Sequence, residues 1–116
     1  PPLSGLGKVK YAELRLRQGD SLSSDAILFL IRDGWRNGDF DEPQEERLLT
    51  VYRDILRDED HEMRLDRLLW EEKTRAAKRM LPLVSEGQQK LARARIALLE
   101  DAKDASFHLS HVPRAL

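Results

Sequence analysis

Cysteine is absent from this sequence of 116 residues. Its absence excludes a disulfide framework, a cysteine-ligated zinc site and a thiol nucleophile, but it leaves the cellular compartment open. Long hydrophobic runs are absent too. The longest is residues 26–31, far fewer than the roughly 20 residues that a helix needs to span a bilayer. The sequence therefore predicts no membrane span.

β-branched residues are few. The chain has four Val, four Ile and two Thr, against twenty Leu and ten Ala. This balance favours helices, because straight-chain residues lose little side-chain freedom in a helix whereas β-branched residues prefer strands. A length of 116 residues is typical of one domain. We therefore expect one all-α domain over residues 1–116, or a fragment of a longer helical domain.

An excess of positive charge is also missing, since 20 Lys and Arg residues stand against 21 Asp and Glu residues. Proteins that bind nucleic acid are normally basic, so the balance argues against that partner. Two short basic clusters could still form a phosphate-binding face: Lys73, Arg75, Lys78 and Arg79, and Arg93 with Arg95. Acidic residues lie among them, which favours an ordinary solvated surface.

Capping and stop signals divide the chain into helices. We expect a first helix from Ser4 to residues 18–20 and a second from Ser23 or Ser24 to residues 37–39, with the apolar run 26–31 contacting neighbours on both sides. Asp41 is the expected N-cap of a third helix, whose wide apolar stripe extends to Leu56.

The second half of the chain shows the same kind of signals. A fourth helix is expected from Asp58 or Asp60 to residues 70–73, a fifth from Thr74 to the residue before Pro82, and a sixth from residue 85, with a short seventh segment at residues 102–111. Two sets of side chains are predicted to be buried: Met63, Leu65, Leu68 and Leu69 in the fourth helix, and the adjoining stripes Leu91, Ala94, Leu98 and Ala92, Ile96, Leu99 in the sixth.

Short connections between such helices predict antiparallel αα-hairpins. There is also faint repetition, because the sequence RQGD at residues 17–20 is echoed by RNGD at residues 36–39, and Trp35 by Trp70. The spacing of the two tryptophans is close to the period of helix-pair repeats. We therefore expect a solenoid of tetratricopeptide-like helix pairs, with a closed helical bundle as the alternative.

No group of residues has the pattern of an active site. Six glutamates are candidates for acid–base chemistry, but each lies in a charged helical turn that favours a solvated face: Glu45, Glu46, Glu59, Glu62, Glu71 and Glu72. His108 and His111 would share a helix face and His61 has acidic neighbours, yet no third metal ligand is evident. We therefore predict no catalytic, cofactor-binding or metal-binding residue. The two tryptophans could stack on a sugar or a peptide, although a core position is more common.

Four segments carry a resemblance to a known family. They are Trp35 with the following GDF turn (W-x-x-GDF, residues 35–40), DH-x-x-R-x-D-x-LLW at residues 60–70, AA-x-RMLPLV at residues 76–84 and A-x-ARIAL at residues 92–98. Together they cover about residues 30 to 100. In these segments the chain resembles the N-terminal helical region of soluble lytic murein transglycosylases.

The resemblance implies a superhelical domain of a periplasmic enzyme that cleaves peptidoglycan glycan strands to 1,6-anhydromuramoyl products. In that family the chemistry resides in a separate C-terminal lysozyme-like domain with a Glu-Ser motif, which this sequence lacks, so no catalytic residue is carried over. The expected partners are that catalytic domain and, through the parent enzyme, the glycan strand. Within the helical region we expect Asp60 to cap a helix and pair with Arg64, and Trp70 to seal the junction with the next helix pair.

Two other functions remain open at this stage. A stand-alone tetratricopeptide-like module would bind a helix or an extended peptide on its concave face. A small enzyme would turn over peptidoglycan by itself, which we do not expect. Because the chain has neither an initiator Met nor a signal peptide, we expect it to be a segment of a longer protein, and a segment with uncovered apolar ends to self-associate.

Overall fold

The computed structural model describes the backbone of residues 3–111 and the side chains of residues 3–103. This part of the chain is all helical and holds no strand. It comprises α1 (Gly5–Arg17), α2 (Asp25–Asn37), α3 (Glu42–Val51), α4 (Asp58–Trp70), α5 (Thr74–Met80), the short 3₁₀ helix η1 (Leu81–Leu83) and α6 (Glu86–His111). None of these helices is long and apolar enough to cross a membrane. The all-α prediction is confirmed.

Local capping explains where the helices begin. The Ser4 hydroxyl accepts a hydrogen bond of 2.9 Å from the Gly7 amide at the start of α1. At the start of α3, the Asp41 carboxylate accepts from the Gln44 amide, while the Gln44 side chain accepts from the Asp41 amide, at 2.8 and 2.9 Å. Such reciprocal bonds satisfy amide groups that the first turn of a helix leaves unpaired.

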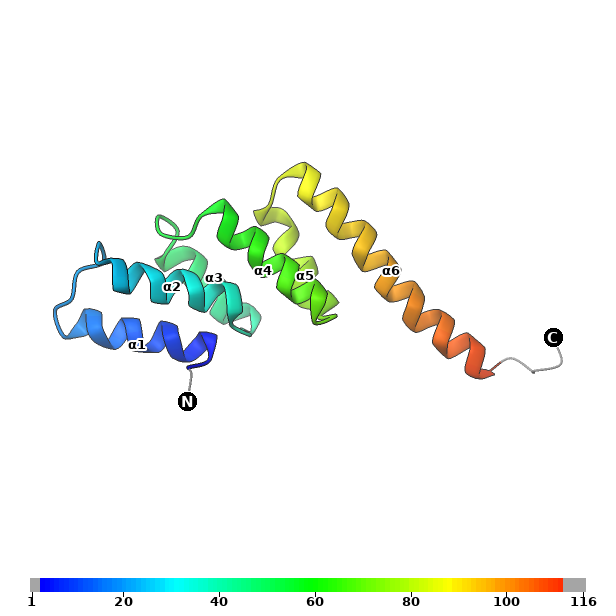
Figure 1. Ribbon diagram of the computed structural model, residues 1–116, viewed down its shortest axis with the longest axis horizontal. Helices are drawn as coiled ribbons and strands as arrows, with labels where there is room; N and C mark the ends of the chain where they lie inside the picture. Colours follow the sequence, from blue (N-terminus) through cyan, green and yellow to red (C-terminus); the bar gives the residue numbers. More distant parts are fainter. Residues whose placement is uncertain (1–2, 112–116) are drawn as a thin grey trace.

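The helices form two layers (Figure 1). In one layer α2 packs on α4 and α4 packs on α6. In the other layer, Glu13 of α1 binds Arg47 of α3 and Tyr52, which directly follows α3. Glu45 of α3 in turn binds Arg79 of α5. Alternate helices therefore stack in succession, which is the arrangement of an αα-solenoid.

The molecule is elongated along this stacking direction. Its radius of gyration is 18.0 Å and its principal extents are 69 × 34 × 21 Å, whereas a compact domain of this length has a radius of gyration of about 13 Å. Figure 1 shows the N-terminal hairpin of α1 and α2 at one end and the long helix α6 projecting from the other. The open solenoid expected from the sequence is found, and the closed bundle is not.

One hydrophobic core runs through the stack. Its buried members come from every α-helix and from the segments between them: Val9, Ala12, Ile27, Ile31, Trp35, Phe40, Leu48, Tyr52, Leu56, Leu65, Leu68, Leu69, Ala77, Met80, Val84, Ala92 and Ile96. Continuous burial of this kind joins helix pairs that could not cover their apolar faces alone.

The first two helices cross so closely that their backbones touch. A Cβ atom added to Gly5 would lie 2.1 Å from the Cα of Gly38, and one added to Gly34 would lie 2.8 Å from the carbonyl oxygen of Gly5. These distances are far below van der Waals contact, so the crossing requires glycine at both positions. The end of α2 is thereby held against the start of α1.

Two expected helix boundaries are wrong. The third helix ends at Val51, because the amides of Ile55 and Leu56 both bond to the carbonyl of Tyr52 and close a turn there. Leu56 is nevertheless buried, as its place in the expected apolar stripe requires. The short seventh segment does not exist as a separate element, since α6 is continuous through residues 102–111.

Several side chains expected in the core are exposed. Met63 is half exposed, and Leu91, Ala94 and Leu98 of α6 lie on the surface. The other stripe of α6 is buried as predicted at Ala92 and Ile96, where the helix meets α4. Phe29 is 61% exposed, so the apolar run 26–31 contacts neighbours on fewer sides than expected. In each case the side chain is on a helix face that no other described element covers.

Candidate functional site

The side chain of Arg64 is fully buried on α4 and pairs with groups from three segments of the chain. Its Nη1 donates to the carbonyl oxygens of Trp35 and Gly38, at 2.7 and 2.6 Å, and its Nη2 donates to Glu45 Oε2 at 2.8 Å. A buried charge is tolerated only when it is paired and hydrogen-bonded. One guanidinium therefore joins the end of α2, the start of α3 and the middle of α4.

Two aromatic rings complete the surroundings of Arg64. Its guanidinium carbon lies 4.4 Å from the centre of the Trp35 ring and 5.1 Å from that of Phe40. The two rings are stacked, with centroids 6.0 Å apart and an interplanar angle of 15°. Burial lowers the pKa of Arg64, and the hydrogen bond to Glu45 opposes that shift. The rings add cation–π attraction to the bonds that stabilise the buried cation.

Asp60 lies in the first turn of α4 and is also fully buried. Its carboxylate accepts from Arg32 Nε at 2.9 Å, from Arg36 Nε at 2.6 Å and from the Arg57 amide at 2.8 Å. Burial acts to raise the pKa of Asp60, but these hydrogen bonds together outweigh it and hold the pKa below its ordinary value. The N-cap of α4 is Arg57 and not Asp60 as expected; Asp60 bonds back to the Arg57 amide from the first turn of the helix.

The expected pairing of Asp60 with Arg64 is wrong. Asp60 binds two arginines of α2, and Arg64 binds Glu45 of α3. The spacing of four residues allowed a bond within α4. The Asp60 side chain instead points to α2 and the Arg64 side chain to α3, where each meets residues of opposite charge.

His61 forms a hydrogen bond with Trp35 beside these ion pairs. Its Nδ1 accepts a hydrogen bond of 3.0 Å from Trp35 Nε1, and the two rings meet edge to face. Burial lowers the pKa of His61, and the charge of Asp60 acts in the opposite direction. Because Nδ1 accepts a hydrogen bond here, it carries no proton and the imidazole is neutral in this arrangement.

The turn at residues 38–40 is bound by basic side chains of α4, of α5 and of the segment between them. Arg67 Nη2 donates to the Gly38 carbonyl at 2.6 Å, and Arg79 Nη2 donates to the Phe40 carbonyl at 3.4 Å. Lys73 Nζ donates to Asp39 at 2.8 Å. We call Trp35, Gly38, Phe40, Glu45, Asp60, His61, Arg64 and Arg79 the Arg64 network. Six of these eight residues lie in the W-x-x-GDF turn and the DH-x-x-R helix.

The predicted solvation of the six glutamates holds for all but one. Glu45 is only 5% exposed, and the other five are exposed or partly exposed. Both Glu45 oxygens are bound by arginine, Oε1 by Arg79 at 2.5 Å and Oε2 by Arg64 at 2.8 Å. A carboxylate whose two oxygens both pair with guanidinium groups inside the protein serves to join helices.

Within residues 3–103, no three His, Asp or Glu side chains are grouped so that they could hold a metal ion. His61 belongs to the Arg64 network. His108 and His111 lie on α6, but their side chains fall outside the described residues.

The two tryptophans have opposite environments. Trp35 is 1% exposed and belongs to the core, whereas Trp70 is 76% exposed at the end of α4. The prediction that Trp70 seals the next helix junction is wrong, because no described element covers that end of α4. Its ring instead borders a surface groove with Met63 and Gln88.

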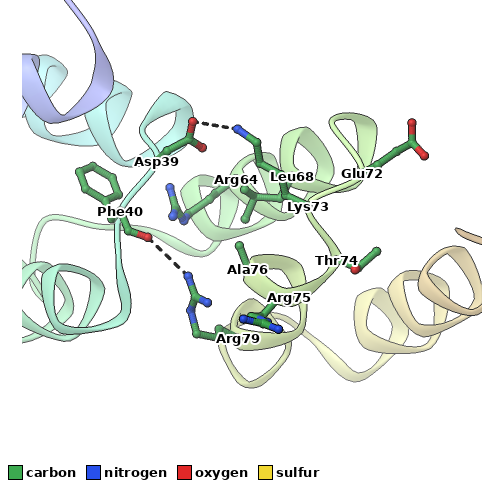
Figure 2. Close-up of a pocket in the computed structure, with 10 residues that line it drawn as sticks. All are labelled: Asp39, Phe40, Arg64, Leu68, Glu72, Lys73, Thr74, Arg75, Ala76 and Arg79. Carbon is green, nitrogen blue, oxygen red and sulfur yellow. Dashed lines mark hydrogen bonds and ion pairs between the residues drawn. The ribbon is translucent and has the colours of Figure 1, made fainter. Parts of the chain in front are cut away.

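Figure 2 shows a cavity of about 650 Å³ beside the Arg64 network, between the turn at residues 38–40 and the region where α4 meets α5. Four of its lining residues are basic and two are acidic: Arg64, Lys73, Arg75 and Arg79, with Asp39 and Glu72. Phe40, Leu68 and Ala76 supply apolar surface. The basic cluster at residues 73–79 indicated the charge, but only the fold brings Arg64 and Phe40 to it.

No family model, curated protein or solved structure matches this chain.

Proposed function

We propose that this chain is a non-catalytic helical scaffold segment of a soluble, periplasmic lytic transglycosylase that cleaves peptidoglycan glycan strands to 1,6-anhydromuramoyl products. The motifs that resemble this family suggest the enzyme. The observation that supports a scaffold role is the Arg64 network, in which motif residues bind other helices of the chain and are buried. Residues used in this way hold the fold and are not free to act on a substrate.

In this proposal the stack of helices forms one wall beside the glycan strand. A wall of this kind must keep its curvature to orient a polymer, and fixed geometry requires locked side chains at the helix junctions. Arg64 and Asp60 form the buried ion pairs that join α4 to α3 and to α2. Bond cleavage is assigned to a catalytic domain of the same polypeptide, with a Glu-Ser motif.

A protein-interaction module is the alternative, and one observation favours it. A groove of about 390 Å³ lies between α4 and α6 and is lined by Leu65, Leu69, Leu91 and Leu98. An apolar groove between helices is the kind of surface on which tetratricopeptide-like modules bind a partner helix.

Reading the complete gene that encodes this chain tests the proposal against the alternative. We expect the reading frame to begin with a secretion signal and to continue into a region with a Glu-Ser motif. A frame that encodes only this helical stack, with no secretion signal, would contradict the proposal and favour the interaction module.

A further inference from the structure

Trp70 is the most exposed of the large hydrophobic residues in the described part of the chain, at 76%. Burial of an indole ring is strongly favourable, so a ring left in water at the end of α4 contributes little to folding. The same ring offers a flat apolar surface to a ligand.

Trp70 belongs to a row of side chains on one face of α4. Glu62, Asp66 and Trp70 follow one another at intervals of four residues, which places them on the same side of the helix over about 12 Å. All three line a groove of about 690 Å³, together with Met63 and with Gln88 of α6. The row has an aromatic ring at one end and a carboxylate at the other.

Two polar side chains of the groove are free to bind a ligand. Among the described residues, neither the Glu62 carboxylate nor the Gln88 side-chain amide has a hydrogen-bond or ion-pair partner. Glu62 offers acceptor oxygens, and the Gln88 side chain offers both a donor and an acceptor. Such groups suit a ligand with hydroxyl and amide groups.

The two arginines of the groove already bind carboxylates of the chain. Arg36 Nε bonds to Asp60 at 2.6 Å, and Arg67 Nη1 pairs with Asp39 and Glu71, at 3.2 and 3.0 Å. An anionic ligand would have to compete with these carboxylates. It would also meet the three acidic side chains of the groove, which are Asp33, Glu62 and Asp66. We therefore expect an uncharged ligand.

The composition of the groove also favours a sugar over a partner helix. Met63 and Trp70 are its only large apolar lining residues, and the other seven of the nine are polar or charged. A helix that binds in a groove buries a continuous apolar stripe, which this lining does not match.

We propose that this groove binds a glycan strand through an uncharged N-acetylglucosamine unit that stacks on Trp70. One face of a pyranose ring presents C–H groups that pack on an indole ring, while its hydroxyl and acetamido groups lie at the ring edge. The edge groups of this unit and of the next one along the strand would bond to Gln88 and Glu62.

This inference rests on the proposed function, which supplies the glycan strand beside the helical wall. It adds the place on the wall where the strand is held. The groove is lined from α2, α4 and α6, which form one layer of the stack (Figure 1). A strand bound there would lie on the exposed side of that layer.

Titration of the ¹⁵N-labelled chain with triacetylchitotriose, followed by amide and indole N–H signals, tests the proposal. The chain has two tryptophans, and the Trp70→Ala variant identifies the indole signal of Trp70. We expect saturable shifts of that signal and of the amides at residues 62–70 and 88, with no shift of the indole of the buried Trp35. Sorbitol, an open-chain polyol without a ring face, is the comparison probe and should cause no saturable shift.

Two variants sharpen this test. Trp70→Ala should weaken binding of triacetylchitotriose about tenfold, because the stacking surface is lost. Phe29→Ala removes another exposed aromatic ring, 61% exposed on α2 and outside the groove, and should bind as the parent does.

Equal shifts with sorbitol and triacetylchitotriose would overturn the proposal, as would equal affinity of the Trp70→Ala variant and the parent. Saturable shifts of the same signals with a leucine-rich amphipathic peptide, and none with the oligosaccharide, would also overturn it and would favour a protein partner. A failure of this kind is distinguishable from a failure of the proposed function, because release of 1,6-anhydromuropeptides by the complete gene product does not depend on sugar binding by the isolated chain.

Discussion

Arg64 binds both the side chain and the backbone of Trp35. Its guanidinium lies 4.4 Å from the centre of the indole ring and donates a hydrogen bond of 2.7 Å to the Trp35 carbonyl oxygen. A single side chain of α4 thereby fixes both the position of the ring and the end of α2. This relationship makes Arg64 the residue on which the junction between the first two helix pairs depends.

Replacing Arg64 by methionine should destabilise the protein strongly. The variant leaves Glu45 buried with one of its two cations missing and leaves the Trp35 and Gly38 carbonyls without their donor. Breaking a buried ion pair in this way costs about 3–5 kcal/mol. Urea unfolding measures the change. Arg93→Met on α6 is the control and should stay within about 0.5 kcal/mol of the parent; a similar small effect at Arg64 would contradict the role given to it.

The two tryptophans should differ sharply in their effect on stability. Trp35→Ala removes a ring that is 1% exposed and should cost about 3–5 kcal/mol. Trp70→Ala removes a ring that is 76% exposed and should change the free energy of unfolding by less than about 0.5 kcal/mol. Thermal and urea unfolding of both variants checks this. Equal losses would show that Trp70 is covered in solution.

His61 should make stability fall as the solution becomes mildly acidic. Burial lowers its pKa in the folded state, so below the ordinary value of about 6.5 the unfolded chain takes up a proton that the folded chain does not. Stability is therefore full above that pH and decreases as the pH falls toward the lower folded pKa. A proton on Nδ1 would also end its hydrogen bond from Trp35.

Unfolding measured from pH 7.5 to 5 tests this effect. His61→Asn keeps an acceptor near the Trp35 N–H but does not titrate, so the variant should show a shallower loss of stability over that range. The same slope in both proteins would contradict the role of His61.

Gly5 and Gly34, where α1 and α2 cross, should tolerate no side chain. Gly5→Ala places a Cβ 2.1 Å from the Cα of Gly38, so the two helices must separate and stability must fall. Gly87→Ala in α6 meets nothing within 4 Å and should instead stabilise the protein by about 0.5–1 kcal/mol, because alanine favours helix. Opposite signs are expected in thermal unfolding. A Gly5→Ala variant as stable as the parent would show that the helices do not cross so closely.

The uncovered stripe of α6 should cause self-association. Leu91 and Leu98 are 64% and 70% exposed. We expect sedimentation velocity to show concentration-dependent dimers.

The double variant Leu91→Ser, Leu98→Ser should sediment as a monomer, whereas the control Leu22→Ser, at an exposed position before α2, should dimerise as the parent does. A parent that stays monomeric at all concentrations contradicts the prediction.

The helix starts were predictable because their signals are local. Ser4 and Asp41 bond to amides three residues ahead, and that spacing is visible in the sequence. Side-chain burial was less predictable, because it depends on neighbours that are distant in the sequence. Trp35 and Trp70 end similar helices, yet only the end of α2 is covered by a following helix.

The Arg64 network could be predicted only in part. Sequence spacing indicated that Asp60 and Arg64 were structural, and both are fully buried. Their partners could not be predicted, because the bond from Arg64 to Glu45 spans 19 residues and depends on the crossing of two helices. Glu45 resembles five solvated glutamates in its local sequence, and only its position between Arg64 and Arg79 makes it different.

Digestion of peptidoglycan sacculi tests the central proposal most directly. The complete gene product that contains this chain would be incubated with sacculi in parallel with the 116-residue chain alone, and the released fragments would be identified by mass spectrometry. We predict 1,6-anhydromuropeptides from the complete product and none from the isolated chain. A complete product that leaves sacculi intact, or an isolated chain that releases these fragments, would contradict the scaffold account.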